Sequence, residues 1–262
     1  MDDNVYKRQH IPCINEQCGS SDALTEYKNG SAHCFACETS WSPAQYNKAR
    51  EGGEDIVPTP RQSKPSKIVK PTGGEICAIE SRCLQLPVVK KFNVRVVRDD
   101  QGNDIKHYYP YYNGEEEVIK IRDVIKKRNN EPFQFVWTDG SSKVDLFGKQ
   151  LFEEGQRYIT LFEGEIDAMS GYQMLNAKGT NFPAIGVKSS SDAERAVRKN
   201  LEYLYSFENV VLCFDMDEPG RKATEKVARL LQTGKTKIVS LPSEYNDANE
   251  MLMAGEQKAF MD

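Results

Sequence analysis

Four cysteines near the start of the chain limit its possible folds more than any other feature. Cys13, Cys18, Cys34 and Cys37 have the spacing Cys-x4-Cys, fifteen residues, Cys-x2-Cys. Two short-spaced pairs let two turns each present two thiolates, which suits tetrahedral zinc, and so small a segment needs such a metal to fold. We therefore expect a small β-rich zinc ribbon, with disulfides or free thiols as the alternatives. Four sulfur ligands leave no open coordination position, so this zinc is expected to be structural.

Between the two cysteine pairs, Lys28–Ser31 has the composition of a hairpin turn. Aromatic residues lie around it, namely Tyr27, Phe35 and Trp41. Aromatic rings on a small ribbon can stack on unpaired nucleic-acid bases, or they can form the core of the ribbon itself. For Trp41 the residues alone leave both interpretations open.

Composition divides the 262-residue chain into four regions. Residues 1–50 contain the cysteine array, and the stretch 51–72 has almost nothing to bury, which predicts a flexible linker. Residues 73–153 contain short strand-like runs, and residues 154–262 alternate strands with helices. Such alternation favours an α/β fold with a parallel sheet.

Nothing in the sequence indicates a membrane protein, because the chain has no apolar run of about 18 residues. Its first residues lack the apolar core of a secretory signal, so we expect a cytosolic location. The net charge of −4 does not suggest a nucleic-acid-binding protein, but it does not exclude one either. An enzyme that holds divalent cations needs many carboxylates, and these lower the total charge.

Local patterns predict the individual elements. The runs 93–98 and 105–112 predict a hairpin, and a third strand is expected over 118–124. Beyond residue 153 we expect strands at 158–162, 184–187, 210–214 and 237–241, and helices at 167–177, 191–205 and 221–231. Ser191 and Glu194 have the spacing of a capping box at the start of the second of these helices.

Acidic residues follow three of the predicted parallel strands. Glu163 comes directly after the first strand, Asp215 and Asp217 follow the third, and Asp247 lies beyond the fourth. The carboxyl ends of parallel strands meet at one edge of a sheet, so we expect these side chains to converge. Crowded carboxylates are favourable only beside cations, and oxygen ligands suit magnesium or manganese, which serve phosphoryl transfer.

Helix capping is the alternative explanation for such acids, because acidic residues favour helix N-termini. It is a fair explanation for Asp167 and Glu218. It explains poorly why Glu163, Asp215 and Asp217 occur together, so a metal site is the main prediction.

Basic residues mark the predicted strand 118–124. Lys120 and Arg122 alternate with isoleucines, so we expect this strand to bury one face and display cations on the other. Further cations follow at Lys127, Lys143 and Lys149. Cations beside a metal site can hold triphosphates and stabilise charge in a transition state, although a solvated surface is the alternative.

Together these motifs resemble the primase half of the bifunctional primase-helicases of short-tailed coliphages of the T-seven type. The resemblance covers nearly the whole chain. Besides the four cysteines, its most specific parts are Lys120-Ile-Arg122, Lys143-Val-Asp-Leu-Phe-Gly-Lys149, Glu163-Gly-Glu-Ile-Asp167, Phe214-Asp-Met-Asp217 with Gly220-Arg-Lys-Ala, and Asp247-Ala-Asn249.

The resemblance implies a multidomain fold in which a four-cysteine zinc ribbon is linked to an α/β primase polymerase domain. That domain would consist of a mixed-β basic subdomain and a TOPRIM domain with a parallel sheet. The implied activity is DNA-directed synthesis of short RNA primers. Glu163, Asp215 and Asp217 would bind the catalytic magnesium or manganese with help from Asp247. Lys120 would lie at the phosphodiester-forming site, with a second lysine, Lys127.

The resemblance also implies that the ribbon binds the template. Two departures from the family lie there: the first cysteine pair is spaced by four residues instead of two, and Ser31 replaces a template-reading histidine. Here His33 directly precedes Cys34 instead. Ser31, His33 and Trp41 are thus the expected template-binding residues.

The implied partners are single-stranded DNA, ribonucleoside triphosphates, a hexameric replicative helicase (fused or separate) and a DNA polymerase, in the cytoplasm of a phage-infected bacterium. One alternative is a non-catalytic recombination mediator that joins a zinc module to a TOPRIM domain. Such proteins open with a helix-hairpin-helix clamp, which is not recognisable here. Another alternative is a TOPRIM nuclease or topoisomerase, but no residue stands out as the nucleophile it would need.

Overall fold

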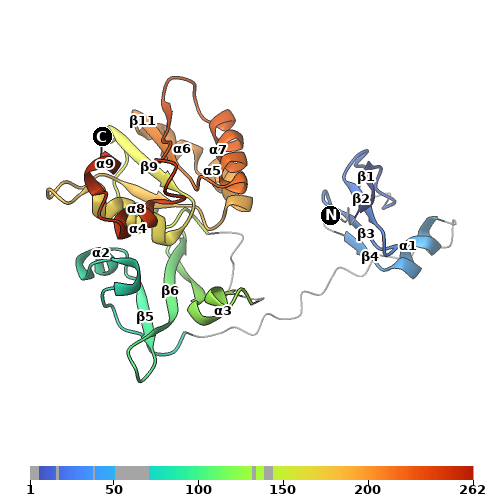
Figure 1. Cartoon of the computed structure of the whole chain (residues 1–262). Helices are drawn as coiled ribbons and strands as arrows, with labels where there is room; N and C mark the ends of the chain where they lie inside the picture. The colour runs from blue at the N-terminus through green and yellow to red at the C-terminus, as the bar shows by residue number, and fades with distance from the viewer. Residues whose placement is uncertain are drawn as a thin grey trace. The chain divides into compact units, whose positions relative to one another are not determined.

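The computed structural model describes residues 6–15, 18–37, 39–50, 71–131, 134–138 and 144–261. The chain forms two compact units, residues 1–67 and 68–262 (Figure 1), and each has its own hydrophobic core. The boundary falls inside the stretch 51–72 that the sequence predicts as a linker. Residues 51–70 of that stretch lie outside the described part of the chain.

The first unit is an antiparallel sheet followed by one helix. Its strands pair in chain order and are β1 (Tyr6–Ile11), β2 (Leu24–Tyr27), β3 (Ala32–Cys34) and β4 (Thr39–Trp41). Helix α1 (Pro43–Arg50) follows β4. The predicted turn joins β2 to β3, where Gly30 has a φ of +83°, a conformation that favours glycine. The expected small β domain and its hairpin are therefore confirmed.

Trp41 belongs to the core of the first unit, which corrects its assignment as a template-binding residue. Only 3% of Trp41 is exposed, and it clusters with Leu24, Ala32, Cys34 and Tyr46. A unit this small has few apolar side chains, so it must bury its largest ring to form a core at all. A buried ring has no free face on which a base could stack.

The second unit begins with another antiparallel sheet. Its strands also pair in chain order and are β5 (Arg95–Arg98), β6 (Asp104–Asn113), β7 (Glu116–Asp123) and β8 (Phe135–Trp137). The helical segments here are η1 (Glu80–Arg82), α2 (Leu86–Lys91), α3 (Val124–Arg128) and η2 (Lys149–Leu151). The predicted strand 93–98 begins only at Arg95, because Asn93 lies in a turn with a φ of +55°. The other two predicted strands are confirmed except at Val124, which starts α3. The reason is that Asp123 accepts a hydrogen bond from the Lys126 N–H and so caps that helix.

A parallel sheet forms the rest of the second unit. In spatial order its strands are β10 (Ala184–Gly186), β9 (Tyr158–Phe162), β11 (Asn209–Cys213) and β12 (Thr236–Ile238). The helices are α4 (Glu165–Leu175), η3 (Ser190–Asp192), α5 (Ala193–Lys199), α6 (Leu201–Ser206), α7 (Glu218–Leu230), α8 (Ala248–Met253) and α9 (Gln257–Met261). Figure 1 shows α4, α8 and α9 on one side of this sheet and α5, α6 and α7 on the other. The predicted parallel α/β fold is confirmed.

None of the helices in the described part of the chain is both long and apolar enough to span a lipid bilayer.

All three predicted helices have different ends from those expected, and α4 spans Glu165–Leu175 instead of 167–177. The helix over 191–205 is interrupted at Asn200, which separates α5 from α6. Ser191 makes no capping box, because it lies in the 3-10 turn η3 that precedes α5. Helix α7 begins at Glu218, earlier than the predicted residue 221, because Asp217 caps it and Pro219 is favourable in a first turn.

One hydrophobic core joins the two sheets of the second unit. The rings of Tyr109 and Tyr111 on β6 lie 6.0 and 5.5 Å from the ring of Phe147. Phe92 stacks on Phe147 at 5.3 Å. Phe147 also exchanges two backbone hydrogen bonds, of 2.8 and 3.0 Å, with Gly186 at the end of β10. The antiparallel sheet is therefore fastened to the edge of the parallel sheet at the carboxyl end of its strands.

Gly171 of α4 occupies a position with no room for a side chain. A β-carbon there would lie 2.0 Å from Cζ of the fully buried Phe162. Alanine in place of glycine ordinarily stabilises a helix by about 1 kcal/mol. Here we expect Gly171→Ala to destabilise the protein by roughly 1–3 kcal/mol in urea unfolding, because the ring cannot move without disturbing the core.

Phe162→Leu removes the ring atoms that an alanine would meet and provides the control. The double variant should therefore lose less stability than the sum of the two single variants. Additive losses, or a Gly171→Ala protein more stable than the wild type, would contradict this packing.

Candidate functional site

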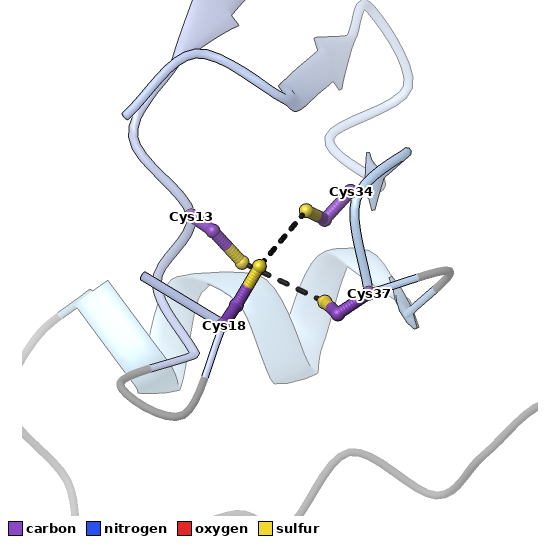
Figure 2. Close-up of side chains that lie close together, drawn as sticks. All are labelled: Cys13, Cys18, Cys34 and Cys37. Carbon is purple, nitrogen blue, oxygen red and sulfur yellow. Dashed lines mark hydrogen bonds between the residues drawn. The ribbon is translucent and has the colours of Figure 1, made fainter. Parts of the chain in front are cut away.

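The four cysteines of the first unit meet at one point (Figure 2). Cys13 and Cys18 lie between β1 and β2, Cys34 ends β3, and Cys37 lies in the turn before β4. All four sulfur atoms are within 4.8 Å of one another, with Cys13 to Cys37 at 3.9 Å and Cys18 to Cys34 at 3.7 Å. Sulfurs bound to a tetrahedral metal at about 2.3 Å would lie about 3.8 Å apart. The cluster therefore has the size of a four-sulfur metal site, as the spacing predicts.

Hydrogen bonds at the cysteine cluster favour the ionised form of some of its members. The Thr39 hydroxyl lies 3.3 Å from Sγ of Cys37, and the Asn15 N–H donates to Sγ of Cys13 over 3.4 Å. Burial alone would raise the pKa of Cys37, but its hydrogen bonds with Thr39 lower it to about 6. Burial raises the pKa of Cys13. Metal ligands must be thiolates, so a bound cation would supply the charge that keeps all four deprotonated.

The second candidate site lies at the carboxyl edge of the parallel sheet. Strands β9 and β11 pair in register to their last residues, so the segments that follow them start side by side. Glu163 follows β9, and Asp215 and Asp217 follow β11. The backbone N–H of Asp215 lies 3.4 Å from Oε2 of Glu163, to which it donates. Gly220 lies so close that a β-carbon there would be 2.8 Å from Oε2 of Glu163.

The carboxylates at this edge, which we call the acidic edge, are close enough to disfavour one another's charge. Burial raises the pKa of Asp215 to about 8, and the charges of four neighbouring carboxylates add to the effect. These neighbours are Asp167, Glu163, Asp247 and Asp217. Burial also raises the pKa of Glu163. Such a group of buried acids is favourable only when a cation neutralises it, and oxygen ligands suit magnesium or manganese.

Two of the predicted ligands also cap helices. Asp217 accepts from the Gly220 N–H at the start of α7, and Asp247 accepts from the Glu250 N–H at the start of α8, both over 2.8 Å. Each carboxylate thus uses an oxygen on a helix, and Asp247 also accepts from the Asn249 N–H. Within the described residues, no three carboxylates bring oxygens within 4.8 Å of one another, as the cysteine sulfurs do. The acids are neighbours rather than a closed ligand set, because like charges repel until a cation draws them together.

Asp167 is a further member of the acidic edge that the sequence analysis assigned to helix capping. Burial, and then the charge of Asp247, raise the pKa of Asp167 to about 7. One of its oxygens accepts from the Asn249 N–H over 3.2 Å. Asp167 follows Glu163 by four residues, but α4 begins only at Glu165, so helical spacing does not relate the two side chains.

Lys120 is buried between the two sheets, which corrects the expectation that its strand displays cations to solvent. Only 5% of Lys120 is exposed. Its Nζ donates to Oε1 of Glu165 over 2.7 Å and to the carbonyl of Lys188 over 2.8 Å. The Tyr111 hydroxyl donates to the same oxygen of Glu165 over 2.5 Å. Glu165, the second glutamate of the motif after β9, was not singled out from the sequence, yet it holds Lys120 next to the acidic edge.

The other predicted cations of this region differ in exposure. Arg122 is partly buried beside Tyr109, and its Nε is buried with no hydrogen-bond partner in the described part of the chain. Lys127 is exposed on α3. Lys143 lies outside the described residues.

Lys149 has structural partners at the break between α5 and α6. Its Nζ lies 3.5 Å from the carboxylate of Asp145 and donates to Oδ1 of Asn200 over 2.9 Å. It also lies 5.1 Å from the centre of the Tyr203 ring. These contacts hold the Lys149 ammonium in place, and its phosphate-binding role stays a prediction.

The remaining predicted template residues lie on or beside β3. Nδ1 of His33 is 2.8 Å from the Ser40 hydroxyl, and the Ser31 hydroxyl donates to Oδ1 of Asn29 over 2.7 Å. Phe35 is 63% exposed and meets the His33 ring edge-on at 4.6 Å. Phe35 is thus an aromatic residue that the ribbon exposes, whereas Trp41 is buried.

Comparisons with known proteins find relatives among the primase-helicases of bacteriophages. A family model described as Toprim-like matches residues 160–252, which include all five acids of the acidic edge. The DNA helicase/primase of Enterobacteria phage T3 is 32% identical over 270 residues. That alignment covers 100% of this chain and 44% of the T3 protein, so the chain spans less than half of its curated relative.

Two solved structures from bacteriophage T7 are similar. The primase fragment of the T7 primase-helicase protein is 30% identical with a TM-score of 0.63, and the match covers 96% of this chain and 97% of the fragment. T7 primase domains of two subunits, bound to an RNA/DNA hybrid and dTTP and interacting with the lagging-strand DNA polymerase, are 31% identical with a TM-score of 0.60. That match covers 72% of this chain and 90% of the other.

The raised pKa of Asp215 makes the stability of the metal-free protein depend on pH. The pKa rises from its ordinary value of 3.8 to about 8 on folding, so the folded state holds this proton more tightly than the unfolded state. The stabilisation is complete below 3.8 and is lost as the pH rises to about 8. We expect the free energy of unfolding in urea, without divalent ions, to fall across this window, and magnesium to restore most stability at its upper end.

Asp215→Asn cannot ionise and is the control for the pH series. Its free energy of unfolding should fall less steeply with pH than that of the wild type, and magnesium should stabilise it less. The same slope in both proteins would show that Asp215 is not the group responsible.

Proposed function

Because the chain belongs to the family of T7-type phage primase-helicases, as their primase half, we propose that it is a DNA primase that makes short RNA primers on single-stranded DNA. The observation that carries this proposal is the acidic edge itself. Glu163, Asp215 and Asp217 adjoin one another beside a buried lysine, and the T7 primase fragment matches this chain along 96% of its length.

The acidic edge is the proposed place for divalent metal. Magnesium or manganese bound there would activate the 3′-hydroxyl of the growing primer and neutralise the incoming triphosphate. Glu163, Asp215 and Asp217 would hold it, with Asp247 and Asp167 beside them. The raised pKa of Asp215 supports this assignment, because the edge is electrostatically unfavourable without a cation. Asp217 and Asp247 are already oriented by the helices that they cap.

Lys120 and Glu165 would act as one unit at the phosphodiester-forming site. An ammonium has three N–H donors, and Glu165 and the Lys188 carbonyl occupy two of those of Lys120. The ammonium also lies 4.5 Å from the centre of the Phe135 ring. Its third donor would stabilise negative charge on the reacting phosphate. Lys127, exposed on α3, is the proposed second lysine, and Arg122 is a proposed phosphate contact.

The first unit would bind the template. Zinc held by the four cysteines would keep this small unit folded. His33 and Ser31 would contact template bases, and the exposed ring of Phe35 would offer them a stacking surface. The sequence that it recognises would depend on these side chains.

The proposed partners follow from the relatives. The T3 relative is named as a helicase as well as a primase, and the T7 primase domains were seen with a DNA polymerase and an RNA/DNA hybrid. By analogy we infer that this chain works with a hexameric replicative helicase and a DNA polymerase, and uses ribonucleoside triphosphates. The proposed place of action is the cytoplasm of an infected bacterium.

Primer synthesis tests the proposed activity directly. The wild type, given single-stranded DNA of mixed sequence, ribonucleotides and magnesium, should release short RNA products. Glu163→Gln should lower the rate by roughly 10²–10³ or more, as expected when a preorganised charge is lost from an active site. Glu153→Gln, an exposed glutamate outside the acidic edge, is the matched control and should keep full activity. Absence of RNA from the wild type, or equal activity in both variants, would refute the proposal.

Metal removal tests the proposed zinc site. Structural zinc contributes about 10–16 kcal/mol in small zinc domains, so Cys34→Ser or strong chelation should unfold the first unit. Backbone amide signals in a nuclear magnetic resonance spectrum would report this loss. The second unit has its own core and should keep its spectrum. Cys83→Ser changes an exposed cysteine elsewhere and should alter neither unit. A first unit that stays folded after metal removal would contradict the assignment.

A further inference from the structure

A pocket next to Glu163 plays no part in the primase reaction proposed for the acidic edge. It has a volume of about 220 Å³ and lies among η3, α5 and α7. This is far more than the roughly 10–15 Å³ that a single water requires. Its polar lining consists of Ser190, Ser191, Glu194, Lys222 and Lys226.

The pocket adjoins the acidic edge through two of the elements that form it. The side chain of Ser190 makes a hydrogen bond with the carboxylate of Glu163. On the other side, Gly220 in the first turn of α7 packs against Oε2 of Glu163. Helix α7 therefore starts at the acidic edge and leads away from it. Lys222 and Lys226 follow on the face that lines the pocket, one helical turn apart.

The charges of the pocket favour an anion. Two ammonium groups and the Ser191 hydroxyl face one carboxylate, Glu194, whose charge is shared with Arg198 at 3.1 Å. The Ser190 hydroxyl is already bonded to Glu163. Lys222 pairs with Glu218 at 2.5 Å, but both side chains are well exposed, so this pair is weak and easily exchanged. No ion pair of Lys226 occurs within the described part of the chain. Phosphate oxygens are suitable acceptors for ammonium and hydroxyl donors.

We propose that this pocket binds the β- and γ-phosphates of a nucleoside triphosphate and the pyrophosphate formed from them. The inference rests on the proposed primase function, because only a nucleotidyl transfer at the acidic edge produces pyrophosphate there. An α-phosphate at the acidic edge leaves the rest of the polyphosphate to extend along α7. Beyond Arg221, which donates to the carbonyl of Met216, Lys222 and Lys226 are the cations that follow in that direction.

The reaction served by this arrangement is a nucleotidyl transfer to the 3′-hydroxyl of the primer. The 3′-hydroxyl oxygen forms a bond to the α-phosphorus, and the bond from that phosphorus to the oxygen bridging to the β-phosphate breaks. The hydroxyl proton passes to water. The bonding electron pair leaves with pyrophosphate, which the two lysines contact as they contacted the β- and γ-phosphates of the triphosphate. Lys222 and Lys226 are thus positioning residues for the polyphosphate.

Calorimetric titration with inorganic pyrophosphate tests the pocket without any turnover. The titration contains no nucleotide, DNA or added magnesium, so the acidic edge repels the ligand and binding reports on the lysines. The double variant Lys222→Ala, Lys226→Ala should bind roughly tenfold more weakly, about threefold for each exposed ionic contact. The matched control, Lys178→Ala with Lys237→Ala, removes the same charge from exposed positions outside the pocket and should bind like the wild type.

We expect Glu194→Gln to change the affinity for pyrophosphate in the opposite direction. Removing the one carboxylate of the pocket should tighten pyrophosphate binding by about threefold, the size expected for one exposed charge. Inorganic phosphate should bind more weakly than pyrophosphate to the wild type, because a single phosphate cannot reach both lysines. Unchanged pyrophosphate affinity in the Lys222/Lys226 variant, or an equal loss in the control pair, would overturn the proposal.

Primer synthesis then separates this inference from the proposed function. The Lys222/Lys226 variant should raise the KM for ribonucleoside triphosphates with little change in kcat, as expected for contacts made equally in the ground and transition states. If the wild type makes no primers, the proposed function fails while the titration still decides whether the pocket binds pyrophosphate. Active wild type with an unaltered KM in the variant would remove Lys222 and Lys226 from nucleotide binding.

Discussion

The ion pair between Lys120 and Glu165 is the contact on which the candidate active site depends. The two groups lie 2.7 Å apart, nearly out of water, and Tyr111 and the Lys188 carbonyl complete their hydrogen bonds. Breaking a buried pair by removing one partner typically destabilises a protein by about 3–5 kcal/mol, because the other charge stays buried without compensation. Lys120 belongs to β7 and Glu165 begins α4. The pair therefore holds the antiparallel sheet against the end of the parallel sheet where the acids gather.

Acidic and basic residues lie in separate places in the second unit, so the net charge of the chain does not indicate whether it binds nucleic acid. Carboxylates crowd at the acidic edge, where burial and mutual repulsion raise the pKa of Asp215. Lys120 of β7 lies next to this edge through Glu165, and Lys222 and Lys226 line the pocket along α7. A net charge of −4 averages over both groups. Within one site, the carboxylates would bind a divalent cation and the basic residues would bind a polyanionic substrate. Nucleotidyl transfer requires both.

The features that the sequence predicts correctly are those that depend on residues close together in the chain. The cysteine spacing predicted a four-sulfur cluster because two short-spaced pairs on adjacent turns converge with little help from the rest of the fold. The alternation of strands and helices predicted the parallel sheet, and the register of β9 and β11 brings Glu163 next to Asp215. The boundaries were less predictable, because a single cap such as Asp123 or a break such as Asn200 is decided by local hydrogen bonds.

By itself, the sequence determined which groups of ligands exist and at which strand ends they occur. Only the tertiary structure decided which side chains are buried. Trp41 fills the small core instead of facing a base, Lys120 is covered by the parallel sheet instead of lying on a solvated face, and Asp167 joins the acidic edge. The pocket between α5 and α7 is likewise formed by segments distant in the chain. Periodicity reports the face of an element on which a residue lies, whereas burial depends on what the remainder of the chain packs against that face.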